Sequence, residues 1–181
     1  MASVRQARVR PMPEKMLCDT GVWLDYFLGN RARHELARTF VDKCEQGGVS
    51  LLVSPASLND FFHLCQLELR QAILKATGDF TPQQEKAARD VAWADLDNLA
   101  ELATVVTADA SDVWLARTHR QVHADFEDDL VVAAAQRAKA DFLITNDEQL
   151  LRHAPVAALS VADAIKVLDA DATSSQRGGA R

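Results

Sequence analysis

The sequence predicts a single-domain α/β protein in which a five-stranded parallel sheet is flanked by helices. Short apolar runs rich in Val, Leu and Ile alternate with longer segments of helical periodicity. This alternation is typical of a parallel sheet covered by helices. The chain of 181 residues is also long enough for one well-buried core, and its length does not require a second domain.

Five segments have the length and composition of strands in such a sheet. They are residues 16–19, 49–53, 103–106, 141–145 and 156–159. Each is followed by a helix-start signal, as expected where strands and helices alternate.

Turn and capping residues indicate where the helices begin and end. The helix over 31–46 is expected to end at Gly47-Gly48. Ser54-Pro55 supplies a cap and a first-turn proline for a helix that we expect to reach Thr77. The capping box over 81–84 starts the following helix.

The domain is expected to span residues 16–168, between two short tails. Residues 1–15 are basic, but no apolar stretch follows them, so they do not have the form of a secretory signal. Residues 169–181 are polar and contain glycine, and we expect them to be disordered. No apolar run is long enough to span a membrane, which together with the absence of a signal predicts a cytoplasmic protein.

Charge and cysteine content narrow the function classes. The net charge of −6 argues against binding of nucleic acid through overall positive charge. It does not exclude a nuclease, because bound divalent cations would supply the positive charge that meets a phosphate. The three cysteines form no CxxC pair and are odd in number, so we expect Cys18, Cys44 and Cys65 to be small core residues.

Aspartates recur at the carboxyl ends of the predicted strands, the edge where open parallel sheets bind ligands. Asp19 ends the first strand, Asp60 lies early in the helix after the second, and Asp147 follows the fourth. Asp128 opens the helix that precedes the fourth strand. Each position has an alternative interpretation, since Asp19 and Asp147 would serve as helix caps and Asp60 would share an exposed stripe with Asn59. Their common edge nevertheless predicts a metal site.

The acid run DFEDD over 125–129 carries more negative charge than the start of a helix requires. Four carboxylates so close together repel one another unless cations intervene. Asp60 lies among apolar neighbours, where a partly desolvated carboxylate needs a cation nearby. Thr145 adds a hydroxyl at the same edge. These all-oxygen donors suit Mg²⁺ or Mn²⁺ better than zinc.

Histidines provide a weaker metal candidate. His119 and His123 have zinc-binding spacing, but the segment HRQVH lacks the glutamate of a zinc peptidase. With Arg117 and Arg120 beside them, they indicate a solvated basic face that would be open to RNA.

Four segments together resemble the PIN domain, the nuclease module of many bacterial toxin–antitoxin pairs of the VapC type. They are MLCDTGVWLDYFLG, LLVSPASLNDFF, DFEDDLVVAAAQRAKADFLITNDEQLL and APVAALSVADAIKVL. The resemblance extends from Met16 to Leu168. It implies a PIN-like fold, and it implies catalytic roles for five residues: Asp19, Asp60, Asp128 and Asp147 as metal-binding carboxylates and Thr145 as a hydroxyl at the same site.

The resemblance also implies an activity. We expect a metal-dependent endoribonuclease that hydrolyses RNA phosphodiester bonds with Mg²⁺ or Mn²⁺, forms a homodimer and, if it is a toxin, binds a protein antitoxin. The alternative is a catalytically weak or inactive PIN-fold module that binds RNA or a protein partner. The family usually has glutamate where this chain has Asp60, and Asp129 remains an alternative to Asp128 as the third ligand. An aspartyl-phosphate phosphatase is disfavoured because Gly21 stands where its second aspartate would be.

Overall fold

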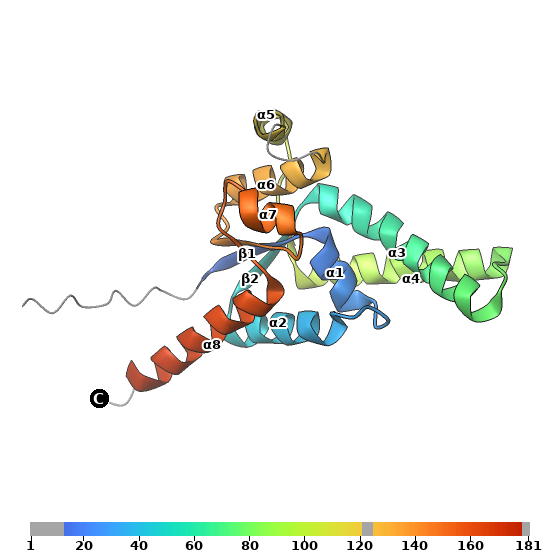
Figure 1. Ribbon diagram of the computed structural model, residues 1–181, viewed down its shortest axis with the longest axis horizontal. Helices are drawn as coiled ribbons and strands as arrows, with labels where there is room; N and C mark the ends of the chain where they lie inside the picture. Colours follow the sequence, from blue (N-terminus) through green and yellow to red (C-terminus); the bar gives the residue numbers. More distant parts are fainter. Residues whose placement is uncertain (1–12, 121–124, 179–181) are drawn as a thin grey trace, which may run out of the picture.

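The computed structural model describes residues 13–120 and 125–178 and contains a parallel sheet with helices around it (Figure 1). The strands are β1 (Lys15–Cys18), β2 (Ser50–Val53), β3 (Thr104–Val105), β4 (Phe142–Ile144) and β5 (Ala158–Leu159). They lie in the order β3-β2-β1-β4-β5, and all neighbouring pairs are parallel. The predicted α/β class with five parallel strands is therefore confirmed, and each predicted strand overlaps an observed one.

Helices connect the strands and also extend beyond them. The helices of the described residues are α1 (Thr20–Phe27), α2 (His34–Gly47), α3 (Pro55–Thr77), α4 (Pro82–Leu102), α5 (Ala110–His119), α6 (Phe126–Ala138), α7 (Glu148–His153) and α8 (Val161–Gly178). The long helices α3 and α4 pack against each other and project away from the sheet, whereas α5 lies across the outer side of α6 (Figure 1). None of these helices is both long and apolar enough to cross a membrane.

The predicted capping residues act as expected. The Ser54 hydroxyl accepts the Ser57 N–H at 2.9 Å, and α3 ends at Gly78, whose positive φ of 76° suits glycine. The predicted capping box starts α4. The helix expected from residue 31 begins instead at His34, because Arg31 belongs to the preceding turn and forms an ion pair with Asp25.

The sheet separates two apolar cores because successive side chains of a strand point to opposite faces. Met16 and Cys18 of β1 face a large core that includes residues of α1 to α4 and α8. Leu17, between them, faces a second core with α6 and α7. The three cysteines are buried and free, as predicted.

The two ends of the chain differ in how far they test the expected tails. Residues 1–12 of the basic N-terminal tail lie outside the described residues. At the other end, α8 continues to Gly178, so the disorder expected from residue 169 does not describe the segment up to that point. A helix that is already nucleated by packing extends at little cost per residue, which a reading of local composition does not capture.

Candidate functional site

Asp19 lies at the carboxyl end of β1, where the chain turns into α1. Its N–H donates to the carbonyl oxygen of Ile144 on β4 at 3.0 Å, which holds the two strand ends together. One carboxylate oxygen accepts the Thr20 N–H at 2.7 Å, and the other accepts the Thr145 hydroxyl at 2.8 Å. Asp19 is therefore a helix cap, as its alternative interpretation expected, and also contacts the residue that follows β4.

Thr145 connects Asp19 to Asp147. The Thr145 side chain is fully buried, and its hydroxyl donates to Asp19 while accepting the Asp147 N–H at 3.0 Å. Asp147 is exposed and caps α7, since its Oδ1 accepts the N–H groups of Gln149 and Leu150 at 2.7 and 3.1 Å. Both of these bonds use the same carboxylate oxygen, so capping does not occupy the second one.

Glu127 provides a further carboxylate at this edge. It lies in the first turn of α6, where Asp125 caps the helix by accepting the Glu127 N–H at 2.9 Å. Its side chain accepts the Thr20 hydroxyl at 3.2 Å and lies near enough to Asp60 of α3 for that residue to raise its pKa. Carboxylates held side by side repel one another unless a proton or a cation reduces their charge. A cation between Glu127 and Asp60 would therefore relieve this repulsion.

Burial and crowding shift the pKa values of two of these acids. Desolvation raises the pKa of Glu127 to about 8, and the hydrogen bond and charge of Asp60 and the charge of Asp19 add to this rise. Burial likewise raises the pKa of Asp19; the hydrogen bonds from Thr145 and Thr20 oppose the rise, and the charge of Asp147 adds to it. The four carboxyl groups thus form one electrostatically linked group.

The acid run needs a finer description than the sequence analysis provided. Asp128 is partly buried in the first turn of α6, and Asp129 beside it is buried, with 2% of its surface exposed. The residue of the run that contacts both Asp60 and Thr20 is Glu127, which was not singled out from the sequence. The excess of acids was the available signal, but it did not distinguish one carboxylate from the next.

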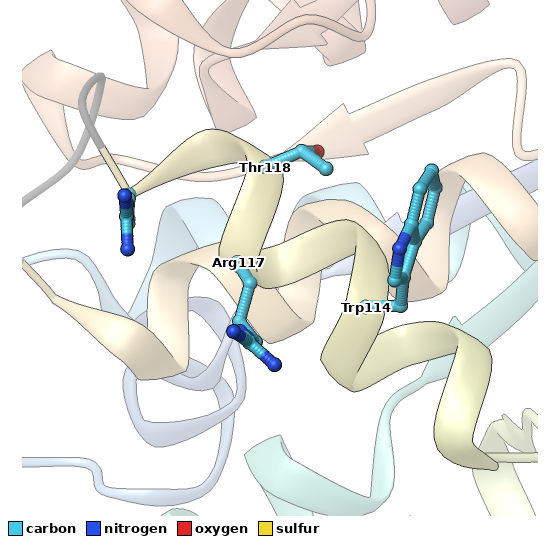
Figure 2. A pocket seen from close by; sticks show the side chains of 4 residues that line it. Trp114, Arg117 and Thr118 are labelled. Carbon is cyan, nitrogen blue, oxygen red and sulfur yellow. The ribbon is translucent and has the colours of Figure 1, made fainter.

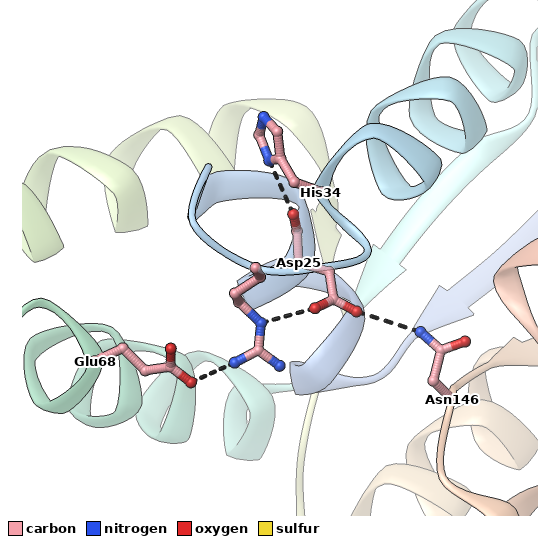
Figure 3. A network of polar contacts seen from close by, with 5 residues as sticks. Asp25, His34, Glu68 and Asn146 are labelled. Carbon is pink, nitrogen blue, oxygen red and sulfur yellow. Dashed lines mark hydrogen bonds and ion pairs between the residues drawn. The ribbon is translucent and has the colours of Figure 1, made fainter. Parts of the chain in front are cut away.

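A second polar network, also absent from the sequence analysis, supports the loop between β4 and α7 (Figure 3). The buried carboxylate of Asp25 accepts Arg31 Nε at 2.7 Å and Asn146 Nδ2 at 3.3 Å. Arg31 also pairs with Glu68 of α3, and His34 Nδ1 contacts the Asp25 carbonyl oxygen at 3.0 Å. Because Asn146 stands between the site residues 145 and 147, this network fixes the loop that carries them.

The donors fit a hard divalent cation in kind. Carboxylate and hydroxyl oxygens are the ligands that Mg²⁺ and Mn²⁺ prefer, and a cation would relieve the repulsion that raises the pKa of Glu127. Within residues 13–120 and 125–178, however, no three Asp, Glu, His or Cys side chains converge into a ready metal-binding group. Because the pKa of Glu127 is raised, binding of a cation at neutral pH requires that carboxyl group to lose its proton.

The alternative zinc pair cannot be built from the described part of the chain. His119 Nε2 lies 3.3 Å from Gln136 Oε1 of α6, and His123 is outside the described residues.

Comparisons with known proteins agree on a fold. Residues 15–149 match the sequence profile of the PIN domain. A crystal structure described as VapBC2 from Rickettsia felis bound to a DNA fragment from its promoter contains a chain that aligns with a TM-score of 0.54 and 12% identity. The alignment covers 81% of this chain and 98% of that one, a likeness that concerns the fold alone. No curated protein shows a significant sequence match.

Proposed function

The chain belongs to the PIN-domain family, whose members are generally nucleases, and from this we propose that it is a Mg²⁺- or Mn²⁺-dependent endoribonuclease that hydrolyses RNA phosphodiester bonds. The observation that carries the proposal is the linked group of acids at the carboxyl edge of the sheet. Asp19 and Glu127 are held there with raised pKa values, which is the state expected of a cation site when the cation is absent.

We assign the metal to Asp19, Asp60, Asp147 and Glu127, and we retain Asp128 as a candidate ligand because it lies in the same turn as Glu127. When bound, the ion would supply positive charge to the phosphate and lower the pKa of a water molecule for attack on phosphorus. An all-carboxylate donor set supports Mg²⁺ or Mn²⁺ over zinc.

The remaining residues would orient the ligands. The Thr145 hydroxyl directs one oxygen of Asp19 and receives the Asp147 N–H, so it fixes the two carboxylates relative to each other. The Thr20 hydroxyl directs Glu127 in the same way. Release of the Glu127 proton would precede metal binding, so affinity for the ion should rise with pH through the neutral range.

The test is incubation of the purified chain with mixed single-stranded and structured RNAs in Mg²⁺, in Mn²⁺ and in chelator. Asp19→Asn and Glu127→Gln should abolish metal-dependent cleavage while the proteins remain folded. Asp90→Asn is a matched control, because Asp90 is exposed on α4 and pairs with Lys86 in the preceding turn. Cleavage that survives in chelator, or in both site variants, would disprove the assignment.

A binding module without catalysis is the second candidate function. The observation that favours it is that no three acids of the described residues converge into a ready metal-binding group. Asp60 is also one methylene shorter than the glutamate that the family usually has there. RNA binding by the wild type without cleavage in either metal would support this candidate.

A toxin role is proposed on the fold alone. The Rickettsia felis structure is described as VapBC2 bound to a DNA fragment from its promoter, and by analogy with VapC-type toxins this chain would form a homodimer and bind a small protein antitoxin. Growth arrest on expression of the wild type, relieved by Asp19→Asn, would support the toxin role.

A further inference from the structure

The helix α5 carries an exposed aromatic and basic face that the proposed active site does not use (Figure 2). Trp114, Arg117 and Thr118 are spaced i, i+3 and i+4, so they project from one side of the helix. With Arg120 at the helix end they line a hollow of about 480 Å³. This set of four residues is called the α5 face below.

Trp114 is the most exposed large apolar side chain of the described residues, with 65% of its surface accessible. The other exposed tryptophan, Trp93 on α4, packs its ring against Phe62 with centroids 4.6 Å apart. No ring contact of Trp114 occurs among the described residues. An indole that is 65% exposed and has no such contact leaves ring surface free for stacking by a planar group.

The charge of the α5 face is positive on an otherwise acidic chain. The acids at the start of α5, Asp109 and Asp112, are both paired with Arg137 of α6. Neither Arg117 nor Arg120 forms an ion pair within the described parts of the chain. Arg117 and Arg120 therefore form a positive patch beside the exposed indole. Because the net charge of the molecule is −6, only such a local patch would attract a polyanion.

The α5 face is also within reach of the carboxylates. Arg120 and Phe126 are six positions apart, so the chain between them spans at most about 22 Å. Phe126 is 52% exposed and directly precedes Glu127, which places a second open aromatic side chain at the edge of the candidate site. Proteins that bind single strands without sequence preference combine such stacking side chains with a basic surface over roughly 4–16 nucleotides.

We propose that the α5 face is a subsite for single-stranded RNA, in which a base stacks on Trp114 and the flanking phosphates contact Arg117 and Arg120. The choice of RNA rests on the proposed function. The strand would continue past Phe126 to the carboxylates, so that the α5 face holds the substrate on one side of the scissile bond. RNA is chosen over an acidic protein partner because an exposed ring beside two arginines matches the alternation of bases and phosphates along a single strand.

The test measures binding separately from cleavage. The full chain is titrated, in chelator, into a labelled single-stranded RNA of roughly 12 nucleotides, and binding is followed by fluorescence anisotropy. Trp114→Ala should weaken binding by about 5- to 150-fold, the range that loss of one stacked base produces, and Trp114→Phe should retain most of the affinity. The matched control Trp93→Ala should stay within about twofold of the wild type.

Salt dependence distinguishes the arginines from the indole. For single strands each phosphate contact contributes about 0.7 to the slope of log affinity against log salt concentration. The double variant Arg117→Gln, Arg120→Gln should therefore lower this slope by about 1.4, while Trp114→Ala should leave it unchanged. If Trp114→Ala fails to fold, Trp114→Phe and the arginine pair provide the test.

Each outcome decides the proposal. An α5 face that binds a protein partner instead would leave RNA affinity and salt slope unchanged in both variants, and that result would overturn the proposal, as would absence of wild-type binding. RNA binding that depends on Trp114, in a chain that cleaves no RNA in Mg²⁺ or Mn²⁺, would instead disprove the proposed hydrolase activity and support the RNA subsite.

Discussion

Replacement of Glu127 by glutamine should make the metal-free protein more stable at neutral and alkaline pH. At low pH the protonated carboxyl of Glu127 and the amide of glutamine are both neutral and have nearly the same shape. As pH rises the wild type must either ionise Glu127 beside Asp60 and Asp19 or keep a proton that the unfolded chain has already released. Glutamine does not titrate, so the variant avoids this loss of stability.

The size of the effect follows from the pKa. The pKa of Glu127 is about 8 in the folded protein against an ordinary value of 4.5, so between these values the folded state holds up to one proton more than the unfolded state. Stability from this group is then complete below pH 4.5 and is lost as pH rises through 8. The slope is at most about 1.4 kcal/mol per pH unit, and solvent screening of a partly exposed side chain reduces the total. We expect a gain of about 1 kcal/mol for Glu127→Gln at pH 8, or about 2–4 °C in melting temperature.

Thermal melts from pH 5 to pH 8 in chelator measure this difference directly. Contributions that are the same in both proteins cancel when the two curves are subtracted. Glu101→Gln, an exposed position near the end of α4, is the control and should show no pH-dependent difference. Free Mn²⁺ at about 100 times its dissociation constant should stabilise the wild type by about 2.7 kcal/mol and the Glu127→Gln variant by less. Parallel curves for wild type and variant across this pH range would refute the raised pKa of Glu127.

Substitutions at four other acids test the site and its support. Asp128→Asn should keep the fold and lose most metal-dependent cleavage of RNA, and full activity in a folded variant would remove Asp128 from the site. Asp129→Asn, at a buried position, should instead show its main effect as a lower melting temperature. Asp60→Glu should preserve or raise the cleavage rate because it restores the glutamate that is usual in the family, whereas Asp60→Ala should abolish cleavage. An active alanine variant would show that Asp60 is a surface residue without a role in the site. Asp25→Asn should destabilise the protein by about 2 kcal/mol, because the Arg31 guanidinium loses its buried carboxylate partner, and an unchanged midpoint in chemical denaturation would contradict that role.

The sequence predicted the sheet because its signals are local. Apolar runs such as 141–145, followed at once by polar residues and a helix start, mark a buried parallel strand with little dependence on distant contacts. Caps are equally local, and Ser54 and Thr81 bond to N–H groups only three residues further along the chain. Parallel topology then carries Asp19 and Asp147 to one edge, since the residues that follow adjacent parallel strands emerge together.

Tertiary structure decided which acid of the run meets Asp60 and which polar groups hold the loop after β4. Glu127 was one of four adjacent acids, and only the packing of α3 against α6 brings it to Asp60. Asp25 and Asn146 are 121 residues apart, and no periodicity or cap connects them. Local chemistry determines where a strand or helix starts, because its energy is set within a few residues. A contact between side chains from different elements depends on how those elements pack, which no short window of sequence contains.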